Sequence, residues 1–131
     1  MEKSLNQKSA SIRVVAMPAD TNPSGDIFGG WVLSQMDLAG GVLASQFSKK
    51  RMTTVAIDNM RFHKPIMVGD LVSFYTKVSA VGKTSITIDI QTYVTRKNVL
   101  LKENQDIKVT EGKFVYVSIN ASGNPIPIKD N

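Results

Sequence analysis

Apolar residues recur at a helical spacing in one long segment, at about residues 30–48. They stand three or four positions apart, which is the spacing of one face of an α-helix, at Val32, Met36, Ala39, Leu43 and Phe47. Further apolar residues lie on the other faces of the same helix, namely Leu33, Leu38, Val42 and Ala44. Because a helix that is apolar nearly all round is a buried one, we predict a buried helix and not a surface helix.

Most of the remaining chain follows a spacing of two, which predicts β-strands. The strands are expected over residues 11–17, 53–62, 71–80, 84–97 and 107–119. The clearest alternation sets Ile86, Ile88, Ile90 and Val94 against Thr87, Asp89, Gln91 and Thr95. The polar segment KENQD, at 102–106, is expected to be a loop. One face of the strand after it is expected to carry Val109, Val115, Val117 and Ile119.

The order of these elements is one strand, a helix and four long antiparallel strands joined by short turns. One helix beside strands of this length predicts an α+β fold, in which a curved antiparallel sheet of about five strands wraps a long central helix. We expect a single domain over residues 1–131, with a flexible arm at 1–9 and a peripheral tail at 120–131. Because such a sheet must cover its edges and its outer face, we expect at least a dimer.

Composition narrows the class of protein. The chain is 42% hydrophobic and 21% charged, as in an ordinary globular domain. It has no cysteine, which excludes disulfides and thiolate metal sites. No window approaches the roughly 20 apolar residues of a membrane span, and the polar N-terminal segment does not resemble a secretory signal. We therefore expect a cytoplasmic protein without a membrane partner.

The net charge of +5 is compatible with an anionic partner, although solubility alone would also account for it. Such a partner could be nucleic acid or a phosphorylated small molecule. The basic residues are dispersed along the chain and few aromatic residues stand among them. A base-stacking platform of the kind used by nucleic-acid binders is therefore weakly supported.

One carboxylate, Asp37, lies in the middle of the otherwise uncharged helix. An unpaired buried carboxylate is costly. Its presence favours a general base or a nucleophile over a purely structural side chain. The structural alternative is an aspartate bonded to the backbone or to a nearby Thr, Ser or Gln side chain.

Gly29 and Gly30 stand at the head of the same helix. Glycine lets a ligand approach the backbone closely, and the free N–H groups of a helix N-terminus suit an anion or the oxygen of a polarised carbonyl. A tight turn packed against a strand is the plainer alternative. Seven residues separate Gly30 from Asp37, so the carboxylate falls near the same face, about 10 Å further along the helix.

Two loop residues and one histidine complete the candidates. Asn22 and Asp26 precede the glycines and could hold a water or a substrate group, although such side chains more often shape loops. His63 is the only histidine. Without a second histidine or suitably spaced carboxylates it does not make a metal site, so no metal is expected. Its position at the end of a strand favours a structural role over catalysis.

Two segments resemble a known family: AMPADTNPSGDIFGGWVLSQMDLAGGVLAS (16–45) and TVAIDNMRFHKPIMVGD (54–70). They closely resemble the hot-dog acyl-CoA thioesterases of the bacterial YciA type, and the resemblance covers about residues 11–119. It implies a hot-dog fold with two protomers joined edge to edge, active sites at the dimer interface, and often a trimer of dimers. The implied reaction is hydrolysis of acyl-CoA to free coenzyme A and a fatty acid. It would cover a broad chain-length range, without a metal or other cofactor.

The resemblance also implies roles for individual residues. Asp37 matches the helix acid that acts as base or nucleophile, and Gly30 with Gly29 matches the amides that polarise the thioester carbonyl. Asn22 and Asp26 match the loop that faces the site from the partner chain. The implied contacts with coenzyme A are Arg61, Phe62, Lys64, Gly82, Lys83 and Ser85.

Other functions remain open at this point. On the same fold, the chain could be a non-catalytic acyl-CoA or acyl-carrier binding protein, or a dehydratase. A dehydratase normally pairs a catalytic histidine with an acid, and His63 does not fit that pattern. A small single-stranded nucleic-acid binder would need an exposed aromatic sheet face, for which the candidates are Phe74, Tyr75, Tyr93, Phe114 and Tyr116.

Overall fold

The computed structural model describes residues 9–98 and 103–129. At residues 97, 98, 103 and 104 it describes the backbone alone. Its elements are β1 (Ile12–Val15), a short 3-10 helix η1 (Pro18–Asp20), α2 (Gly29–Phe47), β2 (Arg51–Phe62), β3 (Leu71–Val81), β4 (Ser85–Asn98) and β5 (Glu103–Ile119). The predicted helix and all five predicted strands are confirmed. The predicted arm at 1–9 lies, apart from Ser9, outside the described residues.

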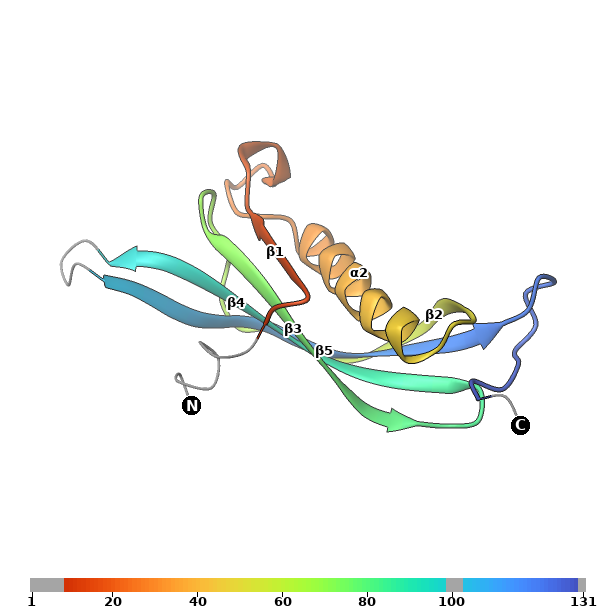
Figure 1. The fold of residues 1–131 in the computed structure, drawn as a ribbon. Coiled ribbons are helices and arrows are strands. Elements are labelled where there is room, and N and C mark those ends of the chain that lie inside the picture. Colours follow the sequence, from red (N-terminus) through yellow and green to blue (C-terminus); the bar gives the residue numbers. More distant parts are fainter. Residues whose placement is uncertain (1–8, 99–102, 130–131) are drawn as a thin grey trace.

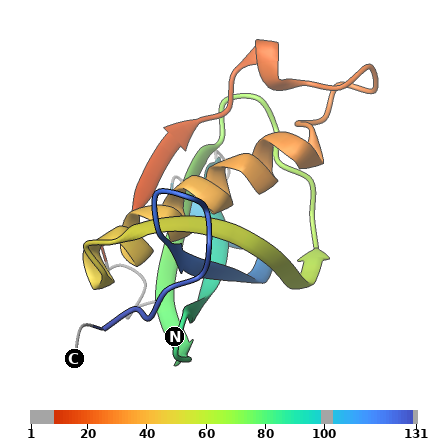
Figure 2. The same cartoon turned by 90° about the vertical axis from the view of Figure 1, so that its right-hand side faces the viewer.

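The five strands form one antiparallel sheet in the order β1-β3-β4-β5-β2. Helix α2 lies across one face of this sheet, and β2 runs back beneath it from the C-terminal end of the helix (Figure 1). Figure 2 shows the sheet curling around the helix. The α+β fold predicted from the sequence is thereby confirmed. In the described residues, no helix is long and apolar enough to cross a membrane.

The core lies between α2 and the concave face of the sheet. Strand β4 supplies its centre, because the alternation predicted there holds without interruption and Ile86, Ile88, Ile90 and Val94 are all fully buried. The aromatic residues lie on the two faces of the sheet according to the alternation along each strand. Phe74, Phe114 and Tyr116 are buried in the core. Tyr75 and Tyr93 are partly exposed and meet edge to face, with ring centroids 5.9 Å apart.

Strand β5 departs from the prediction in two ways. The segment 102–106 is not a loop, because β5 begins at Glu103 and its pairing with β4 continues there, with Thr95 opposite Asp106. The prediction that Val109, Val115, Val117 and Ile119 share one face of this strand is also wrong. Thr110 pairs with Thr92 and Lys108 with Tyr93, so Val109 is an extra residue in a β-bulge. The bulge turns Val109 into the core, whereas Val115 is only half-buried.

Helix α2 is not buried all round within one protomer, contrary to the prediction. Leu38 is 59% exposed and Val42 is 45% exposed. They belong to a face of the helix that the sheet of the same chain does not cover. Val55 and Ile57 are also exposed, on β2, which is an edge strand of the sheet. The molecule therefore leaves apolar surface open on its helix and on one sheet edge.

The C-terminal tail folds back on the turn between β3 and β4. The backbone N–H of Ile128 donates to the carbonyl of Lys83, and the Ser48 hydroxyl donates to the carbonyl of Ile128. Ile128 itself is buried. This tail therefore ties the β3–β4 turn to the C-terminal end of α2, far from the glycines at the helix head.

Candidate active site

Asp37 is half-buried in the middle of α2 and is held from two strands. The Thr54 hydroxyl on β2 donates to Asp37 Oδ1 at 2.6 Å. The Tyr116 hydroxyl on β5 lies 2.8 Å from the Asp37 carbonyl oxygen and 3.2 Å from Oδ1. Among the described residues, both side-chain contacts meet Oδ1, so Oδ2 stays available to another group.

Neither Thr54 nor Tyr116 was singled out as a site residue from the sequence. They stand 17 and 79 residues from Asp37, and no local pattern links them to it. The only available signal was the parity of each strand, which the bulges in β2 and β5 disturb. The pairing of Thr54 with Tyr116 across β2 and β5 places both hydroxyls beneath the helix.

Burial raises the pKa of Tyr116 well above its ordinary value, and the nearby negative charge of Asp37 and the hydrogen bond to it raise it further. The phenol therefore stays protonated at any physiological pH and acts as a constant hydrogen-bond donor.

Asp37 opens onto a hollow of about 550 Å³ at the side of the helix. Its wall is mostly apolar and includes the exposed Leu38 and Val42, with Met52 on β2. A carboxylate with one free oxygen at the edge of an apolar hollow can activate a water or attack a carbonyl carbon.

A second hollow, of about 290 Å³, lies at the head of the helix and gathers several residues singled out from the sequence. It is lined by Asn22, Asp26, Gly29, Phe62 and Lys64, among others. It also includes His63, from the same strand end.

The head of the helix is open for hydrogen bonding. The residue before it, Phe28, makes no side-chain cap. Among the described residues, no hydrogen bond is donated by the backbone N–H of Gly29 or Gly30. A substituent on Gly29 would lie against the Phe62 ring, whereas Gly30 has open space around it. These two N–H groups can therefore receive an anion or a carbonyl oxygen.

The loop residues have partly structural roles. The Asn22 side-chain oxygen accepts from the backbone N–H groups of Ser24, at 2.9 Å, and Asp26, at 3.1 Å. It therefore shapes the turn that leads to the helix, which is the common role of asparagine in loops. Asp26 lies at the edge of the hollow, half-buried.

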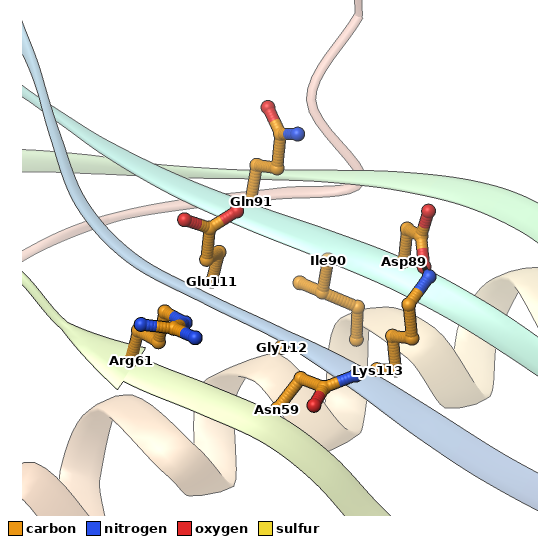
Figure 3. Close-up of a pocket in the computed structure, with 8 residues that line it drawn as sticks. All are labelled: Asn59, Arg61, Asp89, Ile90, Gln91, Glu111, Gly112 and Lys113. Atoms are coloured by element: carbon orange, nitrogen blue, oxygen red, sulfur yellow. Dashed lines mark hydrogen bonds and ion pairs between the residues drawn. The ribbon is translucent and has the colours of Figure 1, made fainter.

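Arg61 lies on the opposite face of the sheet from α2. It lines a smaller hollow, of about 170 Å³, together with Glu111 and the ion-paired Asp89 and Lys113. Figure 3 shows these side chains. Gly82, Lys83 and Ser85 form the β3–β4 turn, at the C-terminal end of the helix. Within one protomer, these four residues are therefore not brought together with either Asp37 or Gly29.

His63 makes a hydrogen bond to Glu111 at the end of β2. Its Nε2 atom lies 2.7 Å from Glu111 Oε2, and Lys108 donates to Glu111 Oε1 at 2.9 Å. These bonds, from Lys108 first and His63 second, hold the pKa of Glu111 below its ordinary value. No group of three or more His, Asp or Glu side chains within the described ranges could hold a metal ion. That the reaction needs no metal stays a prediction.

The comparisons with known proteins agree on one family. The model of the family described as the Thioesterase superfamily matches residues 24–98. The chain is 44% identical over 117 residues to the acyl-CoA thioester hydrolase YciA of Salmonella typhimurium, which covers 89% of this chain and 87% of that protein.

Solved structures are similar over nearly the whole chain. One is a hexameric hot-dog fold thioesterase of Campylobacter jejuni, with a TM-score of 0.87 and 40% identity over 95% of this chain and 92% of that chain. Another is an aspartate-to-alanine variant of a hexameric broad specificity acyl-coenzyme A thioesterase. It has a TM-score of 0.86 and 37% identity over 94% of this chain and 88% of that chain.

Proposed function

This chain belongs to the thioesterase superfamily with the hot-dog fold, and from that premise we propose that it hydrolyses acyl-CoA thioesters to free coenzyme A and a carboxylic acid. The observation that carries the proposal is the Asp37 carboxylate, held through Oδ1 by Thr54 and Tyr116 at the edge of an apolar hollow. The apolar wall suits an acyl chain, and a carboxylate at its edge can serve as the base or nucleophile of thioester hydrolysis.

Asp37 acts in one of two ways. As a general base, it takes a proton from water while the water oxygen bonds to the thioester carbon. As a nucleophile, it attacks that carbon itself, and water then hydrolyses the resulting anhydride. In both routes the carbon–sulfur bond breaks and the thiolate of coenzyme A leaves with the electron pair and takes up a proton.

The N–H groups of Gly29 and Gly30 stabilise the negative charge that develops on the thioester oxygen. They are free of other hydrogen bonds among the described residues, and they point out of the positive end of a helix of 19 residues. Donors of this kind act on charge that is larger in the transition state than in the substrate, so they accelerate the reaction.

The site is completed between two protomers. Gly29 and Asp37 lie about 12 Å apart along one helix, and they line two different hollows. A single thioester group is too small to reach both. A second protomer joined at the edge strand β2 would bring its helix head, with Asn22 and Asp26, toward the Asp37 of the first.

The same pairing explains the exposed apolar residues of the protomer. Leu38, Val42, Val55 and Ile57 would be covered in a dimer with one continuous sheet. The related thioesterases of known structure are described as hexameric. We infer a trimer of dimers for this chain too.

Basic residues would bind the phosphates of coenzyme A. Lys64 lies at the head of the helix, and Arg61, Lys83, Gly82 and Ser85 would come from the sheet face and the β3–β4 turn of assembled protomers. Phe62 offers its ring beside Gly29 to the pantetheine arm. The net charge of +5 then favours binding of an anionic substrate. We expect the enzyme to act in the cytoplasm, without a metal and on a broad range of acyl chain lengths.

The test is release of free thiol from a short, a medium and a long acyl-CoA. The variant Asp37→Asn keeps the size of the side chain and removes its charge. Asp106→Asn is the matched control, because Asp106 is exposed and also accepts from a threonine hydroxyl, that of Thr95. We expect Asp37→Asn to lower kcat by about 10²-fold or more while its assembly is unchanged, and Asp106→Asn to behave as wild type. A wild-type protein that binds acyl-CoA and releases no thiol would instead be a binding protein.

A further inference from the structure

A glycine inside α2 lets the hydroxyl of Tyr116 reach the helix backbone. Gly40 is buried in the middle of the helix, where glycine costs about 1 kcal/mol relative to alanine. A Cβ atom at this position would overlap the Tyr116 hydroxyl oxygen and the Ile90 side chain. At the next residue, Gly41, a Cβ atom would meet nothing within 4 Å. The glycine at position 40 is therefore explained by its contact with β5.

The Tyr116 hydroxyl, for which Gly40 leaves room, contacts two atoms of Asp37. It lies 2.8 Å from the Asp37 carbonyl oxygen and 3.2 Å from Oδ1. The single O–H proton is shared between these two acceptors, so the hydroxyl is fixed against the helix backbone by the shorter bond and against the carboxylate by the longer one. Tyr116 is only 2% exposed, so it reaches bulk solvent hardly at all and acts on the site through Asp37.

We propose that Tyr116 is a positioning residue for thioester hydrolysis, which together with Thr54 holds Oδ1 of Asp37 so that Oδ2 points to the reacting group. Gly40 is part of the same device, because any larger residue would displace the hydroxyl. This inference rests on the proposed function. It adds a residue of a strand to the catalytic groups, which the sequence placed only on the helix and its preceding loop.

Loss of the hydroxyl should change how the carboxylate is aimed. Without it, the carboxylate samples other rotamers, so the fraction of molecules with a correctly aimed oxygen falls. Tyr116 and Thr54 also line the hollow beside Asp37. Phenylalanine at position 116 keeps the ring in that wall, so we expect substrate binding to be unchanged.

The experiment compares Tyr116→Phe with Tyr75→Phe, which removes a hydroxyl from the outer face of the sheet. We expect Tyr116→Phe to lower kcat roughly 10-fold with KM unchanged. The double variant Asp37→Asn with Tyr116→Phe should be no slower than Asp37→Asn alone, since Tyr116 acts through Asp37. Tyr75→Phe should match the wild type in kcat and KM.

A merely structural tyrosine gives a different result. If Tyr116→Phe lowers the melting temperature but keeps the wild-type kcat, Tyr116 does not position Asp37. In that case the proposed function stands, provided that Asp37→Asn is inactive. If Asp37→Asn is itself active, the proposed function fails at its catalytic group.

A second substitution covers the case in which Tyr116→Phe does not fold. Thr54→Val removes the other hydroxyl that donates to Oδ1 and keeps the shape of the side chain. It should also lower kcat with KM unchanged, because the carboxylate loses one of its two fixed donors. Wild-type kcat in a folded Thr54→Val enzyme would overturn the proposal.

Discussion

Asp70 and Asp37 carry the same carboxylate in two different surroundings. Asp70 is 4% exposed and accepts two hydrogen bonds from Arg96, at 2.9 and 2.6 Å, and one from the backbone N–H of Met67. These bonds fix the turn before β3, in which Gly69 takes a positive φ of 92°. Asp37 has no such cation among the described residues and is held by two neutral hydroxyls through one oxygen. Both carboxylate oxygens of Asp70 are thus engaged in hydrogen bonds, whereas Asp37 keeps one oxygen available for the reaction.

The Arg96–Asp70 pair predicts a stability effect. Arg96→Gln removes the forked contact and leaves a buried carboxylate partly unsatisfied, so the free energy of unfolding should fall by about 2 kcal/mol. Urea denaturation measures this change. Arg13→Gln is the control, because Arg13 is exposed and its hydrogen bond to Tyr75 is long, at 3.5 Å. Equal stability of the two variants would contradict the structural role given to Asp70.

Glu111 predicts a dependence of stability on pH. The hydrogen bond from Lys108, and then that from His63, lower the pKa of Glu111 in the folded chain. A carboxyl whose folded pKa lies below its unfolded value adds stability above the unfolded pKa and loses it as the pH falls through the folded one. We therefore expect Glu111→Gln to be less stable than wild type at pH 7, by under about 1 kcal/mol because the pair is partly exposed. The gap should close between about pH 5 and pH 3, as followed by denaturation at each pH, and a gap that widens there would reverse the sign.

At the scale of elements, regular spacing predicts structure well until a strand contains a bulge. Strand β4 alternates strictly and its four predicted core residues are buried. Strand β5 has one extra residue at Val109, and β2 has register shifts at Thr54/Ala56 and Asp58/Arg61. Each shift changes which face the later side chains take, because side chains alternate with a period of two. The bulges thereby help to place Thr54 and Tyr116 under the helix.

The glycine pair inside α2 predicts opposite effects at adjacent positions. Gly40→Ala should lower the free energy of unfolding by about 2 kcal/mol, because the new methyl group overlaps Tyr116 and Ile90 in a packed core. Gly41→Ala should raise it by roughly 0.5–1 kcal/mol, because a Cβ there meets nothing and alanine favours the helix. Thermal and urea denaturation of the two variants side by side give the comparison. The same sign for both would mean that helix propensity, and not the contact with Tyr116, decides the effect at position 40.

At the scale of the whole molecule, the protomer exposes an apolar surface and an unpaired sheet edge. One edge of its sheet, β2, is open, and the helix beside it exposes apolar residues. An open edge with apolar side chains favours pairing with another copy. The two hollows that hold Asp37 and the helix head are separate in one protomer, so assembly and activity are expected to depend on each other.

This dependence is testable with two similar substitutions. Val55 on β2 is 55% exposed and Val81 at the end of β3 is 44% exposed. Val55→Glu should break the assembly into monomers and abolish thiol release, because a charge is buried at the joined edge. Val81→Glu should leave both intact. Size exclusion with light scattering gives the mass, and an active monomer of Val55→Glu would show that one protomer contains a complete site.

The sequence by itself determined the elements and the family of this protein. The helix, the five strands and the buried face of β4 follow from the spacing of apolar residues, because burial of one face imposes a local period. The motifs around Asp37 and the segment 54–70 are also local, so they carried the resemblance to thioesterases that the comparisons confirm. Asp37 and the paired glycines could be chosen as candidates for the same reason.

Only the tertiary structure decided which groups surround those candidates. Thr54 and Tyr116 reach Asp37 through strand register and bulges, and a shift of one residue would turn either side chain to the other face. The exposed face of α2 and the separation of the two hollows depend in the same way on how one sheet covers one helix. Contacts between distant segments are set by the packing of the whole chain, and no local period records them.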